Sequence, residues 1–265
     1  MPDLAALLQL STEAAWNQTG QDWSRALTLW PDGCFCVQSD GRAVSTTIAS
    51  IYDRRLAWIG MVLTKREYQG RGFARGLLNH ALAYLDSKGV ECVKLDATDL
   101  GRPVYVKLGF EDERPVSRWL RRGSSPGGRP PKSETWLDPD MLALDRRAFG
   151  ADRGALLERL AADGDVFSLP GQAFALTRPG RTATHFGPCV AQTRDGAREA
   201  LMGALRKHGS RDMIWDLADE HDDAVRLAME SGFVRTRKLI RMRRGGKAAG
   251  AWSPKIYALA GFEYG

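Results

Sequence analysis

Two stretches of the chain repeat the same loop-and-helix pattern at one fixed offset. The segment Gln69–Arg75 aligns with Gln192–Arg198, which is 123 residues later (192 − 69), and Gly109-Phe110 aligns with Gly232-Phe233 at the same offset (232 − 109). The helical stretches between these landmarks also match in apolar spacing. Two landmarks with a common offset indicate an internal duplication. The 265 residues are therefore predicted to fold as two similar domains.

A stretch rich in Gly, Pro, Ser and Arg lies near the middle of the chain. Because residues 121–133 offer little apolar surface to bury, they are typical of a linker. We therefore expect a first domain at residues 1–122, a linker at 123–134 and a second domain at 135–265.

The first half mixes extended segments with amphipathic helices. Apolar residues recur at helical spacing along residues 71–87, and Gly89 follows as a helix terminator. The expected elements are a helix at about 4–14, strands at 34–38, 44–52 and 56–63, a helix at 71–87, a strand at 92–96, a short helix at 102–108 and a strand at 115–120. This order predicts an α/β or α+β sheet with a parallel crossover.

Composition argues against several classes of protein. With 43% hydrophobic and 26% charged residues, the chain is typical of a soluble globular protein. No apolar run is long enough to span a bilayer, and the first residues do not resemble a signal peptide. The four cysteines have no cluster of His or Cys around them, so we expect reduced thiols in a cytoplasmic protein and no metal site.

A basic run at residues 235–244 accounts for part of the net charge of +6. One interpretation is a patch that binds nucleic acid. The run lacks the interleaved aromatic residues that stack on bases, which favours a strand with exposed basic side chains. Basic surface would also attract an anionic nucleotide cofactor.

The loop Gln69–Ala74 lies between an apolar strand and the long helix. Its glycines, Gly70 and Gly72, permit positive φ and a close approach of the backbone to a ligand. Free N–H groups at the start of a helix suit a pyrophosphate, and Arg71 and Arg75 add charge-assisted contacts. The loop has neither the third glycine of a dinucleotide fingerprint nor the Gly-Lys-Ser/Thr of a P-loop. The alternative is an ordinary turn that contains glycine.

This strand, loop and helix resemble the signature of the GNAT N-acetyltransferase superfamily, Gln/Arg-x-x-Gly-x-Gly/Ala. A second family element, Tyr-x-x-x-Gly-Phe, follows about 35 residues later as Tyr105–Phe110. The resemblance covers roughly residues 1–120 well and the second half more weakly. It implies two tandem GNAT-like domains of the α/β (α+β) class, each with a mixed, mostly antiparallel twisted sheet flanked by helices. It also implies transfer of acetyl from acetyl-CoA to an amine by direct attack.

The resemblance further implies where coenzyme A binds. The pantetheine arm would pair with backbone groups of Val62, Leu63 and Thr64, and an N–H near Val62 would polarise the thioester carbonyl. Thr98 stands where many family members have an asparagine that contacts the coenzyme. The pyrophosphate would lie on the loop residues Gln69, Gly70, Arg71, Gly72, Phe73 and Ala74.

Attack by a neutral amine requires two proton transfers. Tyr105 matches the family's general acid, which would protonate the leaving thiolate; the alternative is a packing role for this aromatic ring. The base is not readable from the sequence. Glu67, Asp96 and Asp53 are candidates, but for each of them a surface or structural role is favoured.

N-terminal helices line the acceptor pocket in this family. Here the candidates are Trp16, Asn17, Asp22 and Trp58, because tryptophan faces and polar groups can bind an amine. The tryptophans would equally well anchor a helix to the sheet. We expect a small-molecule amine as acceptor, with a protein lysine as the alternative, and we expect neither a membrane nor a nucleic acid as partner.

The second copy has lost the residues that suggest catalysis. Thr193 and Asp195 replace the two loop glycines, and Ala228 replaces the tyrosine. An aspartate in this loop would repel pyrophosphate. We therefore expect the second domain to keep the fold and to close the acceptor site without binding a coenzyme; the alternative for this domain is that it binds a regulator. The alternatives for the whole chain are a non-catalytic acyl-CoA-binding or regulatory protein and a basic nucleic-acid-binding module.

Overall fold

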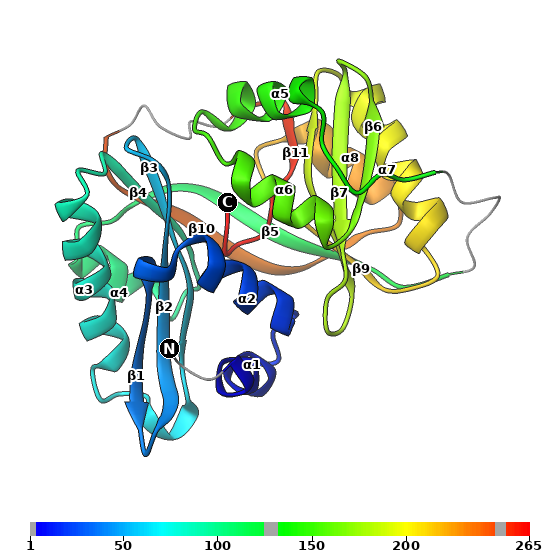
Figure 1. Cartoon of the computed structure of the whole chain (residues 1–265). Coiled ribbons are helices and arrows are strands. Elements are labelled where there is room, and N and C mark those ends of the chain that lie inside the picture. The colour runs from blue at the N-terminus through cyan, green and yellow to red at the C-terminus, as the bar shows by residue number, and fades with distance from the viewer. Residues whose placement is uncertain (1–3, 125–131, 247–252) are drawn as a thin grey trace.

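The computed structural model describes residues 4–124, 132–246 and 253–265 (Figure 1). Residues 125–131 of the predicted linker lie outside these ranges. The elements predicted for the first half are confirmed to within a few residues, and one further helix, α2, precedes the first strand. The first half contains α1 (Leu4–Glu13), α2 (Gly20–Leu29), β1 (Cys34–Ser39), β2 (Arg42–Asp53), β3 (Leu56–Thr64), α3 (Phe73–Ser87), β4 (Cys92–Ala97), α4 (Arg102–Lys107) and β5 (Glu111–Arg121).

The second half repeats this succession of elements and adds one short strand. It contains α5 (Pro139–Phe149), α6 (Gly154–Ala162), β6 (Asp165–Leu169), β7 (Ala173–Arg178), β8 (Thr184–Ala191), α7 (Arg194–His208), β9 (Met213–Ala218), α8 (Asp222–Glu230), β10 (Val234–Gly245) and β11 (Ile256–Ala258). The shared order confirms the duplication at the level of the fold. Every helix in the described ranges is too short or too polar to cross a lipid bilayer.

Helix α3 shows how the sequence pattern sets the local structure. Its buried residues recur at spacings of one, three and four, so they form a single apolar stripe that packs on the sheet. They are Leu77, Leu78, Ala81, Leu82 and Leu85. The helix ends just before Gly89, whose φ of +67° is one that glycine adopts without strain.

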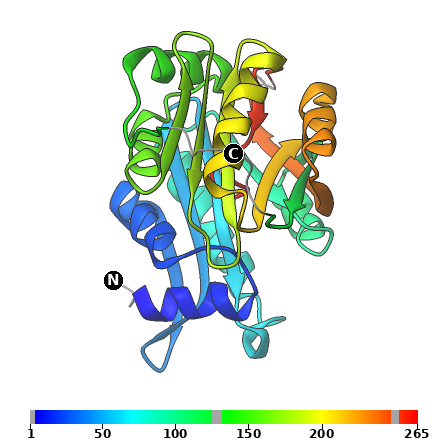
Figure 2. The same cartoon turned by 90° about the vertical axis from the view of Figure 1, so that its right-hand side faces the viewer.

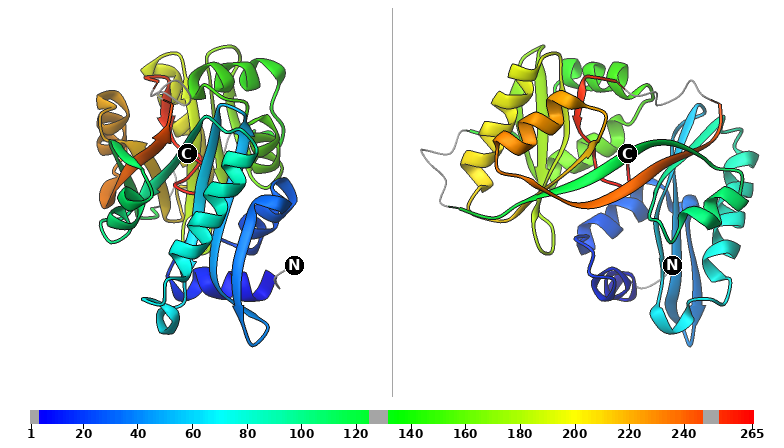
Figure 3. Two further views of the ribbon diagram at one scale, coloured as in Figure 1. Left: turned by 90° about the vertical axis from the view of Figure 1, so that its left-hand side faces the viewer. Right: turned by 180° about the vertical axis from the view of Figure 1, so that it is seen from behind.

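The two halves share one continuous sheet. Its strand order is β1-β2-β3-β4-β10-β5-β9-β8-β7-β6, with β11 paired to β8. Within the described residues, only β3–β4 and β8–β9 are parallel pairs, which confirms a mixed, mostly antiparallel sheet. Strand β10 of the second half lies between β4 and β5, and β5 of the first half pairs with β9. Each half therefore gives its last long strand to the other, and Figure 3 (right) shows β5 and β10 crossing between them.

Helices cover both faces of the sheet in each half. Because neighbouring residues of a strand point to opposite faces, each strand packs against helices on both sides. In β2, Ile48 packs with α1 and α2, whereas Ala49 packs with α3. In β7, Phe174 packs with α5 and α6, whereas Ala175 packs with α7. Figure 2 shows α7 on one side of the second half's strands and the green helices α5 and α6 on the other.

The basic run predicted from the sequence forms β10, an interior strand. Its central arginine, Arg241, is buried and makes a two-bond ion pair with Asp96 of β4, and Arg243 pairs with Glu111 of β5. The expectation of exposed basic side chains is therefore wrong for Arg241. The burial of these basic side chains depends on tertiary structure, because their counter-ions lie on strands more than 100 residues earlier in the chain.

The segment Leu259–Gly265 lies between the two halves (Figure 1). The Phe262 carbonyl accepts a hydrogen bond from Trp58 Nε1 at 2.9 Å, and the Tyr264 carbonyl accepts one from the Tyr52 hydroxyl at 2.6 Å. These bonds fasten the segment to strands β2 and β3 of the first half.

Candidate active site

The parallel strands β3 and β4 separate after a short paired stretch. They pair only at Ala57 with Val93 and at Trp58 with Lys94, although β3 is nine residues long. On its other edge β3 is irregular near Met61, whose φ of +52° is unusual for a residue other than glycine. The separation opens a V in the middle of the sheet, and beyond Trp58 this edge of β3 has no strand partner among the described residues.

A cavity with about 660 Å³ of empty space, part of it open to solvent, lies in this V. Strands β3 and β4 and Tyr105 contribute to its lining. Further lining residues are Arg118 of β5, Arg237 of β10 and Phe262 of the segment between the halves. Both halves of the chain therefore build the cavity, as a direct result of the strand exchange.

The predicted coenzyme loop leads away from the end of β3. Gly70 and Gly72 have φ values of +76° and +83°. A Cβ at Gly70 would meet open space, so glycine is needed here for its backbone conformation. The N–H groups of residues 70–75 donate to no acceptor within the described part of the chain. These free amides lie at the positive end of the α3 dipole, which is an arrangement suited to a phosphate group.

The other predicted coenzyme residues support this loop. Gln69 Nε2 donates to the Thr64 carbonyl at 3.0 Å and so ties the loop to the end of β3. Arg71 donates to the Glu67 carbonyl and lies over the ring of Tyr68, 4.9 Å from its centre. Phe73 and Ala74 form the first turn of α3 and are half-buried. Arg71 is exposed, so its side chain is able to turn toward an anion.

The residues predicted to bind the pantetheine arm differ in which of their atoms a ligand can reach. Val62 lines the cavity, whereas the Leu63 side chain is buried in the core beside α1 and α2. The Thr64 hydroxyl is hydrogen-bonded to Ser45 at 2.8 Å. Leu63 can therefore meet a ligand only through its backbone. Thr98 also lines the cavity, and its hydroxyl accepts the Gly101 N–H at 3.2 Å.

Tyr105 of α4 lies at the wall of the cavity, with 8% of the residue exposed. Its ring meets Phe110 edge to face, with 6.0 Å between ring centres. Its hydroxyl has no hydrogen-bond partner among the described residues. Burial raises the pKa of the Tyr105 hydroxyl to about 12, because the phenolate would lose its hydration. The group therefore keeps its proton at neutral pH.

None of the three candidate bases lies free in the cavity. Both carboxylate oxygens of Asp96 accept bonds from Arg241, and the side chain is fully buried. Asp53 accepts backbone N–H groups in the turn between β2 and β3, and Glu67 is exposed beside Lys65. Asp96 is thus a structural ion-pair partner, and the other two carboxylates lie outside the residues that line the cavity.

Of the four predicted acceptor residues, only Trp16 lines the cavity. Asn17 instead holds the turn between β7 and β8, since its amide donates to the Ala183 carbonyl at 2.9 Å and accepts from the Ala183 N–H at 3.0 Å. Trp58 is buried, and its indole faces the Arg241 guanidinium at 4.5 Å. Direct acceptor contacts by Asn17 and Trp58 are therefore not supported, because their polar groups are engaged within the protein.

Asp22 is also a structural residue. It is 3% exposed and accepts from the Thr19 N–H at 2.8 Å, which caps α2. Its carboxylate is paired with Arg25 at 2.8 Å and with Arg178 at 3.5 Å. Burial alone would raise the pKa of Asp22, but the two arginines hold it below its usual range. A cationic acceptor would have to displace these partners.

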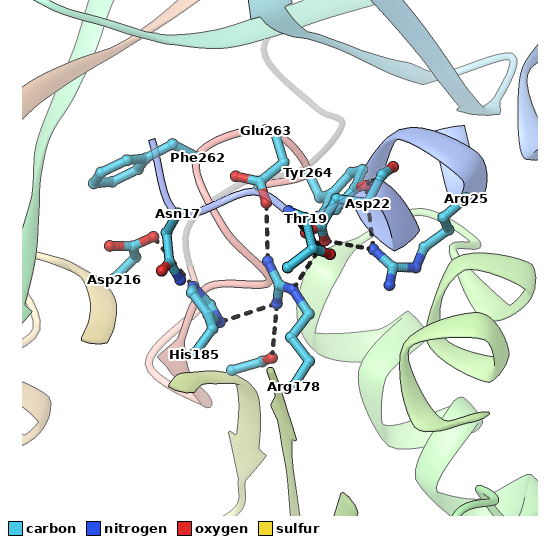
Figure 4. Close-up of polar contacts among 12 residues, drawn as sticks. Asn17, Thr19, Asp22, Arg25, Arg178, His185, Asp216, Phe262, Glu263 and Tyr264 are labelled. Atoms are coloured by element: carbon cyan, nitrogen blue, oxygen red, sulfur yellow. Dashed lines mark hydrogen bonds and ion pairs between the residues drawn. The ribbon is translucent and has the colours of Figure 1, made fainter. Parts of the chain in front are cut away.

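Figure 4 shows the polar contacts of the buried charged residues around Asp22 and Arg178. Arg178 donates to Glu263 at 2.9 Å and contacts His185 at 2.9 Å. His185 lies 3.3 Å from Asp216, whose two oxygens each accept a bond from Arg118 at 2.7 Å. Burial and the adjacent Arg178 lower the pKa of His185, so the ring stays neutral. This chain of contacts fixes Arg118 and Glu263 in the cavity wall.

Sequence reasoning missed several residues of the cavity, and two of them, Gln18 and Arg237, have polar side chains without a partner among the described residues. Gln18 is 8% exposed, and its Oε1 atom has no hydrogen-bond partner in the described ranges. Arg237 reaches the cavity from β10. Gln18 directly follows two predicted acceptor residues, so its place in the sequence could have identified it. The basic run drew attention to the segment that contains Arg237, but only the pairing of β10 with β5 places this residue at the cavity.

In the second copy the corresponding features are lost. Thr193 Oγ1 accepts the Gly196 N–H at 3.1 Å, so a side chain already caps α7. Strand β11 pairs with β8 at Val190 and Cys189, and the Tyr257 carbonyl accepts from the indole of Trp215 on β9. The chain itself thus occupies the opening between β8 and β9.

Comparison with known proteins agrees with this architecture. Residues 2–110 match the model of the acetyltransferase (GNAT) family, and residues 141–258 match that of an acetyltransferase (GNAT) domain. An uncharacterized N-acetyltransferase of Bacillus subtilis, YitH, is 26% identical over 87% of this chain and 84% of its own length. Among the described residues, no group of three or more His, Cys, Asp or Glu side chains could hold a metal ion.

Solved structures share the fold across nearly the whole chain. A candidate acetyltransferase from Pyrococcus horikoshii superposes with a TM-score of 0.87 at 22% identity, over 99% of this chain and 92% of that one. A tandem GNAT protein from the clavulanic acid biosynthesis pathway superposes with a TM-score of 0.61 at 15% identity, over 92% and 95% of the two chains. The chain therefore belongs to the GNAT N-acetyltransferase superfamily and carries two GNAT domains in tandem.

Proposed function

We propose that the protein transfers an acetyl group from acetyl-CoA to a small amine in the cavity between β3 and β4. The observation that carries this proposal is the contrast between the two copies. The first keeps an open V and a helix start with free amides, whereas the second has a capped helix and an opening filled by β11. One coenzyme should therefore bind per chain, and the walls supplied by both domains favour a small amine over a protein lysine.

Residues of the first half can take part in the steps that direct acyl transfer requires. The free amides of residues 70–75 would hold the pyrophosphate, and the unpaired edge of β3 would bind the pantetheine arm. An N–H near Val62 would stabilise the charge that develops on the thioester oxygen. As the amine nitrogen bonds to the carbonyl carbon and the carbon–sulfur bond breaks, the protonated Tyr105 hydroxyl would protonate the thiolate. The ammonium proton would leave through water, which would also reprotonate Tyr105.

Calorimetric titration with acetyl-CoA tests the site, with Gly72→Asp as the probing variant. The aspartate adds a negative charge where the pyrophosphate would lie, so binding should weaken by at least about 100-fold. Gly41→Asp is a matched control, since Gly41 also has a positive φ, +75°, and open space around it in the turn between β1 and β2. Equal losses in both variants, or no binding to the wild type at micromolar concentration, would refute the site.

Turnover is tested by the release of free thiol from acetyl-CoA across classes of amines. Thiol release that depends on the amine supports the transferase. Binding without release for any amine would instead support a non-catalytic acyl-CoA-binding protein. The proposal includes a cytoplasmic location, which the four free cysteines support because thiols stay reduced there.

A further inference from the structure

The charges that line the cavity leave one cation without a partner. Four charged residues contribute to the lining, namely Asp96, Arg118, Arg237 and Glu263. Asp96, Arg118 and Glu263 each have a buried partner of opposite charge. The Arg237 side chain forms neither a hydrogen bond nor an ion pair with any residue that the structure describes, and the residue is exposed in part.

The position of Arg237 indicates which kind of ligand its unpaired charge would bind. In the register of β10 and β5 it lies opposite Arg118, so two guanidinium groups are close neighbours at this wall. Burial of part of the side chain, and then the positive charge of the adjacent Arg118, lower the pKa of Arg237. A planar guanidinium binds carboxylate or phosphate groups well through two parallel donors.

The anion for this position is not supplied by the proposed coenzyme site. The negative charges of coenzyme A are its phosphates, and these belong on the loop at residues 69–74. Besides Arg237, the cavity lining includes several residues outside the predicted coenzyme set, among them Trp16, Gln18 and Leu239. An anionic group near Arg237 must therefore come from the second substrate.

Gln18 supplies an independent observation in the same cavity. Its side-chain oxygen is buried without a hydrogen-bond donor within the described residues, which is costly unless a ligand or water satisfies it. A carbonyl oxygen accepts hydrogen bonds and so suits the N–H group of an amine.

We propose that the acceptor is a small amine that also carries an anionic group, with Arg237 binding the anion and Gln18 accepting a hydrogen bond from the amine. This inference rests on the proposed acetyl transfer and narrows its substrate class. The anion is a carboxylate or a phosphate, because the guanidinium presents the same pair of donors to both.

The experiment compares amines that differ in the anionic group alone. Suitable pairs are β-alanine with β-alaninamide and aminoethyl phosphate with ethanolamine, and kcat/KM is measured from thiol release. Arg237→Gln removes the charge and Arg237→Lys keeps it without the planar fork. Lys238→Gln is the matched control, because this exposed neighbour loses the same charge but points to the opposite face of the strand. Each variant is compared with the wild type on the same amine, so differences in amine basicity cancel.

We expect Arg237→Gln to lower kcat/KM for the anionic member of a pair by about 10-fold or more and to leave the neutral member nearly unchanged. Arg237→Lys should recover part of the loss, and Lys238→Gln should have no selective effect. The pair that shows the effect identifies carboxylate or phosphate. Equal effects on both members of each pair, or turnover of other amines only, would overturn the inference while the acetyl transfer stands. No thiol release with any amine would refute the proposed function itself.

Discussion

Replacing Tyr105 with phenylalanine separates catalysis from packing at the centre of the site. The substitution removes only the hydroxyl, and the edge-to-face contact with Phe110 remains. Because the hydroxyl has no hydrogen-bond partner among the described residues, no buried group is left unsatisfied. The free energy of unfolding should change by less than about 1 kcal/mol.

The rate should respond quite differently. A positioned general acid contributes about 100-fold or more, which corresponds to roughly 3 kcal/mol of the activation free energy. We expect kcat of Tyr105→Phe to fall by that factor while the Kd for acetyl-CoA stays within about twofold of the wild type. Tyr84→Phe, the same change on α3 and outside the residues that line the cavity, should alter neither quantity.

The pH dependence adds an independent check. The acid works only while it is protonated, so its contribution is present below the pKa and is lost as pH rises through it. With the pKa of Tyr105 raised by burial to about 12, the acid should remain competent at pH 10, where an ordinary tyrosine is half ionised. An unchanged kcat in Tyr105→Phe would refute the acid role. A rate that already falls near pH 10 through ionisation of this group would refute the argument from burial.

Two further predictions distinguish structural from catalytic roles. Asp96→Asn should lower the free energy of unfolding by about 3–5 kcal/mol, because Arg241 would stay buried without its counter-ion; unchanged stability in denaturant titrations with a large loss of kcat would instead identify Asp96 as the base. Asn17→Ala should cost about 1–3 kcal/mol, since the Ala183 N–H and carbonyl lose their partner. Its KM for the acceptor should stay within about twofold, and a selective rise in KM at unchanged stability would show that Asn17 contacts the amine.

The strand exchange gives the second domain a physical role in the site. Arg237 and Leu239 of β10 line the cavity of the first domain because β10 lies between β4 and β5. The segment Leu259–Gly265 adds Phe262 and Glu263 to the same wall. A first domain cut from the chain would lack β10 and would expose the edge of β4 (an edge that the sheet of the full chain covers).

Several properties of this protein are determined by the sequence alone. The glycines at 70 and 72, the apolar stripe of α3 and the Tyr105–Phe110 element were readable because positive φ and helical periodicity are local requirements. The duplication was readable for the same reason, since both copies show these local patterns at one offset. The loss of the loop glycines in the second copy was readable too, whereas the capping of α7 by the Thr193 side chain came only from the structure.

Only the tertiary structure decided which polar residues are free for chemistry. Asn17, Asp22 and Asp96 looked available in the sequence, but partners far away in the chain engage them, such as Ala183, Arg178 and Arg241. Gln18 and Arg237 are more than 200 residues apart and meet in one cavity through the exchange of β5 and β10. The pairing of strands across such separations depends on packing over the whole sheet, and no local pattern encodes it.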